Sequence, residues 1–207
     1  MVRPTRQMRL TEAHVARMAL LVTPDGPLPP AETATDEDFR QFTQDILAGS
    51  DGSDQIWVFA YGSLIWKPAS DFVEIRTGLL RGWHRAFCLG WNTWFRGSEA
   101  NPGLMLALDR GGNRYSAPLH EPPRWVTVMT EHGPVRAFTF CIDRNSGRYV
   151  SGLSEAEIAD VLAKAVGSRG SMVEYLFNTV SHLEQLGIHD PHLWRLQELV
   201  AQRLDGV

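Results

Sequence analysis

The chain has 207 residues, 43% of them hydrophobic, and a formal net charge of −4. This apolar content supports a folded core and excludes an intrinsically disordered chain, while the length is typical of one domain or one domain with an appendage. The slightly acidic balance argues against a nucleic-acid partner, because proteins that bind nucleic acid usually carry a strongly basic face.

The first 53 residues predict a helical appendage that precedes the main domain, which we expect over residues 54–207. Thr11 is suited to cap a short helix that runs to about Leu21. The prolines between Pro24 and Pro30 then stop any helix, because proline has no amide hydrogen and restricts the residue before it. Thr35, followed by three acidic residues, predicts a second helix that stops at Gly49.

The sequence contains no apolar run near the roughly 20 residues that a membrane-spanning helix needs. The apolar stretch after the N-terminal arginines is short for a signal peptide and has no small-residue cleavage site behind it. We therefore expect a cytoplasmic protein without a membrane partner.

The middle of the chain, from about Gln55 to Asp143, is predicted to be mostly β-structure. Its apolar runs are short and are separated by glycine and proline turns, which is typical of buried strands. The predicted strands cover residues 56–61, 72–76, 79–89, 104–108, 125–129 and 135–142.

The C-terminal part is predicted to be helical. Ser154 and Glu157 have the spacing of a capping box, so they predict the start of the first helix. The second helix is expected from Glu174 to Leu186, and Pro191 suits the first turn of the third. Strands followed by helices predict an α+β fold.

The two cysteines, Cys88 and Cys141, each lie in an apolar stretch. They form no CxxC pair, so the sequence predicts neither a zinc ribbon nor a redox motif. We interpret them as buried thiols in a reducing compartment, and expect no metal and no cofactor.

A buried strand ends abruptly in the sequence Tyr61-Gly62-Ser63-Leu64. Gly62 allows a sharp turn and a close approach of a ligand to the backbone. Consecutive amides freed at such a turn can converge on a carboxylate, an oxyanion or a phosphate. The alternative is an ordinary turn between two elements.

A second unusual stretch, from Gly90 to Gly97, places aromatic residues beside Arg96. They are suited to wall a small-molecule pocket in which Arg96 holds a carboxylate. Two other interpretations are open: stacking on a nucleic-acid base, and a core aromatic cluster with a surface arginine. The nucleophile motif GxSxG is absent, so local motifs do not support covalent catalysis.

Several motifs occur in a fixed order beyond residue 55, and in this order they resemble the ChaC-like, glutathione-specific γ-glutamylcyclotransferases. The motifs are Tyr61–Pro68, Gly82–Cys88, Phe95–Gly97, Pro102–Leu108, Pro123–Val126, Gly170–Ser171, Glu174–Val180 and His182–Glu184.

The resemblance implies a mixed β-barrel flanked by helices and an enzyme whose small-molecule substrate is glutathione. The substrate's own α-amine attacks its γ-carbonyl carbon, which releases 5-oxoproline and leaves cysteinylglycine, so no protein nucleophile is required. By resemblance, Ala60, Tyr61, Gly62, Ser63 and Leu64 form the substrate loop. Tyr175 is then expected beside the pocket, and a carboxylate takes the proton of the α-ammonium.

The chain departs from the family pattern between Gly112 and Pro123. The family has a strand, a helix and an acidic segment with the catalytic glutamate there, whereas ten residues bridge the gap in this chain. That length is too short for those elements, so the fold is expected to be shortened. Glu121 is the only acid in the bridge and is the candidate substitute base; Glu99 is a second candidate.

Two functions are compatible with this departure. The first is an active γ-glutamylcyclotransferase, a lyase of glutathione degradation, in which another acid serves as the base. The second is a catalytically inactive module that keeps the loop and binds γ-glutamyl or carboxylate groups. Loss of a strand and a helix would expose apolar edges, which a homodimer would cover.

Overall fold

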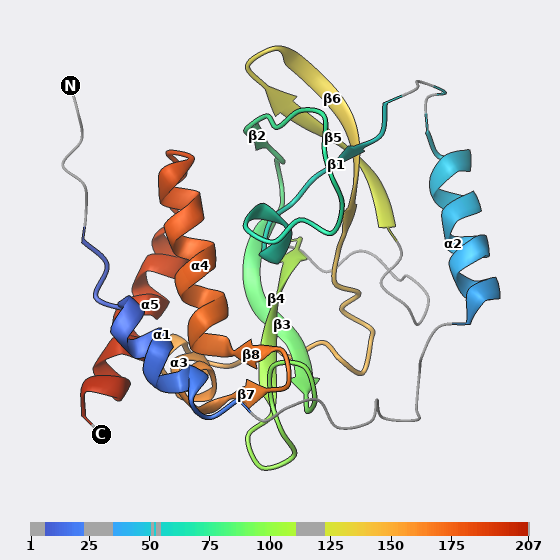
Figure 1. Cartoon of the computed structure of the whole chain (residues 1–207). Helices are drawn as coiled ribbons and strands as arrows, with labels where there is room; N and C mark the ends of the chain where they lie inside the picture. The colour runs from blue at the N-terminus through green and yellow to red at the C-terminus, as the bar shows by residue number, and fades with distance from the viewer. Residues whose placement is uncertain (1–6, 23–34, 51, 53–54, 111–122, 207) are drawn as a thin grey trace, which may run out of the picture. The chain divides into compact units, whose positions relative to one another are not determined.

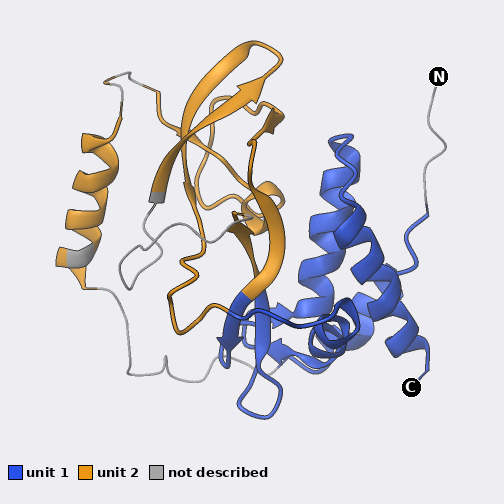
Figure 2. Cartoon of the chain, turned by 180° about the vertical axis from the view of Figure 1, so that it is seen from behind, with its two compact units in different colours: residues 1–26, 89–105, 150–207 blue, residues 27–88, 106–149 orange. Residues whose placement is uncertain are grey.

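The computed structural model describes residues 7–22, 35–50, 52, 55–110 and 123–206 (Figure 1). The chain divides into two compact units, each assembled from separated stretches of sequence (Figure 2). Unit 1 contains residues 1–26, 89–105 and 150–207, and unit 2 contains residues 27–88 and 106–149.

Unit 2 is built on a four-stranded sheet with the order β1-β6-β5-β2. Strands β5 (Pro123–Thr130) and β6 (Gly133–Phe140) form an antiparallel hairpin, and β1 (Trp57–Val58) runs parallel to β6. Strand β2 (Gly78–Leu79) pairs antiparallel with β5. Gly133, at φ 104, closes the hairpin turn, a backbone conformation that favours glycine.

The two faces of this sheet carry different contacts because side chains alternate along a strand. Val126 and Ala137 are paired and belong to the hydrophobic core of unit 2. Trp125 and Phe138 are the neighbouring pair, and they contact each other edge to face, with ring centroids 6.0 Å apart. The remaining core residues are Leu80, Leu108, Val128 and Cys141, with Trp57, Phe59, Tyr61 and Trp83 packed against them.

Helix α2 (Asp36–Ala48) also belongs to unit 2 and packs on the face of the sheet that carries Trp125 and Phe138. Phe42 stacks on Phe140 at a centroid distance of 6.1 Å, and Nε1 of Trp125 donates to the carbonyl oxygen of Ile46 at 3.1 Å. Arg136 donates to the carbonyl oxygen of Gly49, just beyond the helix.

Strands β3 (His84–Asn92) and β4 (Gly103–Asp109) pair with each other in a second sheet. Each strand runs from one unit into the other, with the divisions at 88/89 and 105/106. Every residue of β4 except Met105 is buried, so this strand does not leave a bare apolar surface.

Unit 1 is mainly helical. Helix α4 (Met172–Gln185) contacts α1 (Glu12–Ala19), α3 (Glu155–Lys164) and α5 (Pro191–Asp205), and α3 and α5 also pack together. Their contact faces, together with Leu10 just before α1, form a core of residues that are almost completely inaccessible to solvent: Leu10, Leu162, Leu176, Val180, Leu183, Leu193, Leu196 and Val200.

A short hairpin links α3 to α4. It consists of β7 (Val166–Gly167) and β8 (Gly170–Ser171), which pair antiparallel. Gly170 adopts a φ of 110, as the hairpin turn requires.

The predicted α+β class and the predicted helices are confirmed. The Ser154 side chain accepts from the Glu157 amide, as in a capping box, and Pro191 occupies the first turn of α5 behind the cap Asp190. The strand predicted at 56–61 is shorter, since only β1 is a strand there, and the strand predicted at 79–89 is divided between β2 and β3.

The strand predicted at 72–76 is wrong. Its residues form no strand, and Val73 is fully exposed, because the apolar run packs against nothing that would hold it in a sheet. The mixed β-barrel that the resemblance implies is not closed in the described part of the chain, where the strands form three separate sheets. The boundary at 53/54 stays a prediction; the two N-terminal helices themselves belong to different units.

Candidate functional site

The predicted substrate loop in unit 2 folds into a single turn of 3-10 helix, η1 (Ser63–Ile65), which begins directly after Gly62. The amide of Ile65 donates to the carbonyl oxygen of Gly62 at 3.0 Å, and the amides of Trp66 and Lys67 donate to that of Ser63. The chain therefore leaves β1 and turns within a few residues, as the sequence predicts.

The turn leaves a group of amides uncommitted. In the part of the chain that the structure describes, no acceptor bonds to the amides of Gly62, Ser63 or Leu64. The first amides of any helical turn lack an acceptor within that turn. Gly62 is buried, whereas Ser63 and Leu64 are half-buried, so a ligand at this turn would have partly sheltered donors.

The preceding residues anchor the loop firmly within unit 2. The Phe59 amide donates to Phe138 at 2.9 Å, and the Thr139 hydroxyl donates to the carbonyl oxygen of Phe59. Arg85 Nε donates to the carbonyl oxygen of Tyr61 at 2.9 Å, and the Tyr61 side chain packs against the unit 2 core. The loop is thus held from behind by strands β6 and β3.

Arg96 and Tyr175, the other two predicted substrate-binding residues, lie in unit 1 and contact each other. The guanidinium carbon of Arg96 is 5.7 Å from the centroid of the Tyr175 ring. Both residues are buried. The structure thus excludes the interpretation of Arg96 as a surface residue.

Arg96 already has a carboxylate partner, Glu174. Its Nη1 lies 2.5 Å from Oε2 of Glu174 and also donates to the carbonyl oxygen of Ser171 at 2.9 Å. The sequence prediction did not join Arg96 to Glu174, because the two lie 78 positions apart. The only sign of a link between them in the sequence was that both residues belong to the motifs that resemble the family.

The candidate bases predicted from the sequence are not placed together with these groups. Glu121 lies outside the described residues, and Glu99 is exposed in a turn of unit 1. The sequence prediction overlooked a third carboxylate, Asp109, which is buried at the end of β4. Asp109 accepts two hydrogen bonds from Arg144, and the Tyr149 hydroxyl and His84 lie near it.

The buried Asp109 carboxylate helps to raise the pKa of two neighbours, Arg144 and Tyr149. Hydrogen bonding to Asp109 raises the pKa of the Arg144 guanidinium above its ordinary value. Burial, followed by the nearby Asp109 charge, raises the pKa of the Tyr149 phenol. Both shifts strengthen the assembly of a cationic Arg144 and a neutral Tyr149 around the carboxylate.

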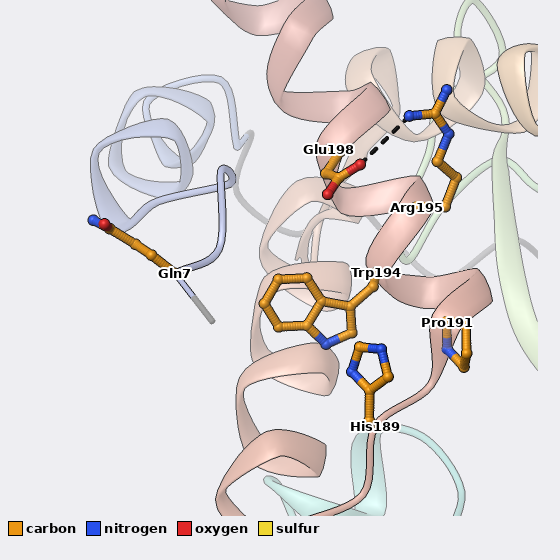
Figure 3. A pocket seen from close by; sticks show the side chains of 6 residues that line it. All are labelled: Gln7, His189, Pro191, Trp194, Arg195 and Glu198. Carbon is orange, nitrogen blue, oxygen red and sulfur yellow. Dashed lines mark hydrogen bonds and ion pairs between the residues drawn. The ribbon is translucent and has the colours of Figure 1, made fainter. Parts of the chain in front are cut away.

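A hollow of about 450 Å³ lies elsewhere on unit 1, between the start of the described chain and α5 (Figure 3). Its size suits a small molecule. Its charged side chains already pair: Arg195 with Glu198, and His189 with Glu184, which also accepts from the indole of Trp194. None of the predicted site residues lines it. Its lining also includes Gln7 and Pro191.

The described residues contain no cluster of histidine, cysteine, aspartate or glutamate suited to hold a metal ion. Both cysteines are buried, as predicted. Within the same described ranges, no helix has the length and apolar character needed to cross a bilayer.

Comparison with known families gives a match to the model of the ChaC-like proteins over residues 56–117 and 112–203. The two matched stretches overlap only in the short bridge that departs from the expected pattern. Among curated proteins, the glutathione-specific γ-glutamylcyclotransferase of Escherichia coli K12 is 35% identical over 180 residues, covering 73% of this chain and 78% of that protein. The mouse glutathione-specific γ-glutamylcyclotransferase 1 is 27% identical over 184 residues, covering 74% of this chain and 82% of that protein.

The fold has a similar counterpart among solved structures. The crystal structure of a yeast γ-glutamyl cyclotransferase specific to glutathione superposes with a TM-score of 0.61 at 22% identity, covering 72% of this chain and 99% of that one. This likeness shows the fold, including the shared α+β arrangement.

The alignment with the bacterial relative also measures the shortening. The 73% of this chain's 207 residues amounts to about 151, so about 29 of the 180 aligned positions have no counterpart here. A strand and a helix with their loops need about that many residues. The family match is also divided into two stretches at residues 112–117, and together with the unaligned positions this division supports a missing segment in the bridge.

Proposed function

Since this chain belongs to the ChaC-like family, we propose that it is a γ-glutamylcyclotransferase that degrades glutathione to 5-oxoproline and cysteinylglycine. The names of its curated relatives in bacteria and mammals support the substrate. The structural observation that carries the proposal is the turn after β1, where the amides of Gly62, Ser63 and Leu64 have no acceptor among the described residues.

The proposed reaction needs only proton transfer and positioning from the protein. The α-amine nitrogen of glutathione forms a bond to the γ-carbonyl carbon, and the bond from that carbon to the cysteine nitrogen breaks. A carboxylate first accepts a proton from the α-ammonium, and the leaving nitrogen is then protonated. Residues Ala60, Tyr61, Gly62, Ser63 and Leu64 are proposed to hold the glutamyl part in the folded conformation that brings amine and carbonyl together.

Amides at the turn are also suited to stabilise the negative charge that develops on the γ-carbonyl oxygen. Such donors are most effective when they are fixed before the reaction. The anchoring of Phe59 by Thr139 and of Tyr61 by Arg85 gives the turn that rigidity. Arg96 and Tyr175, which contact each other within unit 1, are proposed to support substrate binding.

Glu121 is proposed as the proton acceptor in place of the family's glutamate. It is the only acid between Gly112 and Pro123. The shortened bridge also motivates the second candidate function, a module that binds γ-glutamyl groups without converting them. The protein is further proposed to reside in the cytoplasm, where glutathione keeps thiols reduced.

The test is incubation of the purified protein with glutathione and quantification of 5-oxoproline and cysteinylglycine. We expect stoichiometric release of the two products. N-acetylglutathione should bind without conversion, because its blocked amine cannot attack. Glu121→Gln should lower kcat by about a hundredfold or more, the usual effect of losing a general base.

The matched control is Glu131→Gln, which removes a carboxylate from the exposed turn between β5 and β6. This change should leave kcat and KM as they are in the parent protein. Calorimetric binding of glutathione without any product would overturn the enzymatic proposal and support the inactive module. Full activity of Glu121→Gln would instead remove Glu121 from the mechanism.

A further inference from the structure

We infer that Arg96 is a positioning residue, which orients Tyr175 and the turn at residues 94–97 through its ion pair with Glu174, and does not bind a substrate carboxylate directly. The inference rests on the proposed function and refines it for unit 1. It contrasts with the simplest expectation for an arginine in a carboxylate-binding enzyme, namely direct contact with the substrate.

The guanidinium is already neutralised inside the protein. The Arg96 side chain is 9% exposed, and its Nη1 contacts both Oε2 of Glu174 and the carbonyl oxygen of Ser171. A substrate carboxylate at this guanidinium would have to displace Glu174, whose side chain is 34% exposed, from its ion pair. Breaking a pair in which one member is buried is unfavourable.

The same guanidinium fixes the Tyr175 ring. Tyr175 is buried, and the cation lies 5.7 Å from the ring centroid, within the range of a cation–π interaction. Glu174 and Tyr175 are adjacent in the first turns of α4, so the arginine restrains two neighbouring side chains of one helix. Loss of Arg96 would release both.

Arg96 also lies where three segments meet. The hairpin between α3 and α4 is bonded to the turn that carries Arg96: the amide of Ser168 donates to Trp94 at 2.9 Å, and that of Arg169 donates to Phe95 at 2.8 Å. Asn92 accepts from the Arg96 amide through its side chain at 2.8 Å. The arginine side chain then ties this turn to the start of α4.

Two glycines make this close packing possible. A methyl group on Gly167 would meet the backbone of Trp94 and Gly97, and one on Gly170 would collide with the Glu174 carboxylate and with Arg96. Space around the ion pair is therefore already filled by the hairpin. This density is typical of a structural joint rather than of a ligand site.

The two roles predict different kinetics. A direct ligand loses binding when it is removed, so Arg96→Met would raise KM while Glu174→Met would not. A positioning pair acts as one unit, so the two substitutions share a phenotype and are not additive. Displacement of a pocket wall by about 1 Å can lower turnover by about a hundredfold.

The experiment compares kcat and KM for glutathione in the parent protein, Arg96→Met, Glu174→Met and the double variant. We expect each single change to lower kcat about tenfold or more while KM stays within about threefold of the parent value. The kcat of the double variant should lie within about threefold of that of the less active single variant. The control is Arg195→Met, whose side chain is 52% exposed and pairs with Glu198 on α5; its kinetics should match the parent protein.

Hydrogen exchange provides a second measurement that does not depend on activity. Loss of either partner should accelerate exchange of the Ser168 and Arg169 amides, which bond to the turn, while the β5–β6 hairpin keeps the parent rate. If the parent protein has no turnover, the proposed function is wrong. The exchange measurement then still shows whether the pair of Arg96 and Glu174 holds the turn in place. A rise in KM of tenfold or more in Arg96→Met, with unchanged exchange and normal Glu174→Met, would overturn it.

A variant that does not fold leaves the test intact. Glu174 has a side chain that is 34% exposed, so its replacement disturbs the interior less than that of Arg96. If Arg96→Met is recovered only as aggregate, Glu174→Met alone separates the roles, because a direct-ligand role for Arg96 predicts normal kcat and normal exchange in that variant.

Discussion

Arg144 binds Asp109 through two parallel hydrogen bonds, in which Nε and Nη2 each lie 2.7 Å from a different carboxylate oxygen. This geometry is among the strongest that an arginine and a carboxylate form. It joins the end of β4 to the segment after β6, where the Ile142 amide also donates to the carbonyl oxygen of Leu108. The pair therefore fixes the point at which the chain enters the shortened bridge.

Arg144→Met should destabilise the protein by about 3 kcal/mol, because it leaves the buried Asp109 carboxylate without its cation. Urea unfolding followed by tryptophan fluorescence measures the change. The double variant Asp109→Asn with Arg144→Met removes the unpaired charge and should recover part of the loss. Equal stability of Arg144→Met and the parent protein would show that the pair contributes nothing.

Tyr149 should make the stability of the protein fall at alkaline pH. Its phenol has a raised pKa in the folded state, owing first to burial and then to Asp109, so folding favours the neutral form. The corresponding stability is present below the unfolded value, about 10, and is lost as the pH rises through the folded pKa. In Tyr149→Phe the unfolding free energy should decline less steeply above pH 10. Identical slopes in the two proteins would contradict the assignment.

Trp125→Phe should loosen helix α2 without unfolding unit 2. The substitution removes the indole donor to the carbonyl oxygen of Ile46 but keeps an aromatic ring against Phe138. Hydrogen exchange in peptides covering residues 36–48 should accelerate, while exchange in β6 stays slow. Trp66→Phe, in the turn after η1, serves as a control for the loss of an indole. Unchanged exchange in α2 would mean that the stacking of Phe42 on Phe140 suffices to hold the helix.

Gln197→Leu should detach the segment before α1 from α5. The Gln197 side chain is inaccessible to solvent, and its Oε1 accepts from the Leu10 amide at 2.8 Å. Leucine leaves that amide without a partner in a buried place, which costs about 1–3 kcal/mol. Thermal unfolding measures the loss. Gln202→Leu, on the exposed side of the same helix, should change the midpoint little.

The features predicted well from the sequence are those set by neighbouring residues. Ser154 with Glu157 specifies a helix start through local hydrogen bonds, and Pro191 suits a first helical turn; both were found where predicted, and the structure adds Asp190 as the cap of the latter helix. The sharp turn at Gly62 was predicted from the same kind of local information. Short-range hydrogen bonds and backbone preferences largely determine these features, so neighbouring residues are enough to predict them.

The features that were missed depend on contacts between distant residues. The run at 72–76 has the composition of a strand, but Val73 faces solvent because no partner strand receives it. The pairing of Arg96 with Glu174 and that of Asp109 with Arg144 each bring together charges that are far apart in sequence. Of the candidate site, the sequence predicted the loop and named Arg96 and Tyr175, but not the ion pairs that hold such residues in place.

The interleaved composition of the two units has a consequence for the order of events during synthesis. All residues of unit 2 have been translated once Tyr149 is added, whereas unit 1 requires the chain to continue to its C-terminal helices. Arg96 is added 78 residues ahead of its carboxylate partner Glu174. On the ribosome, therefore, unit 2 is the first of the two to have all its residues, and the ion pair of Arg96 can form only after the start of α4 has been added.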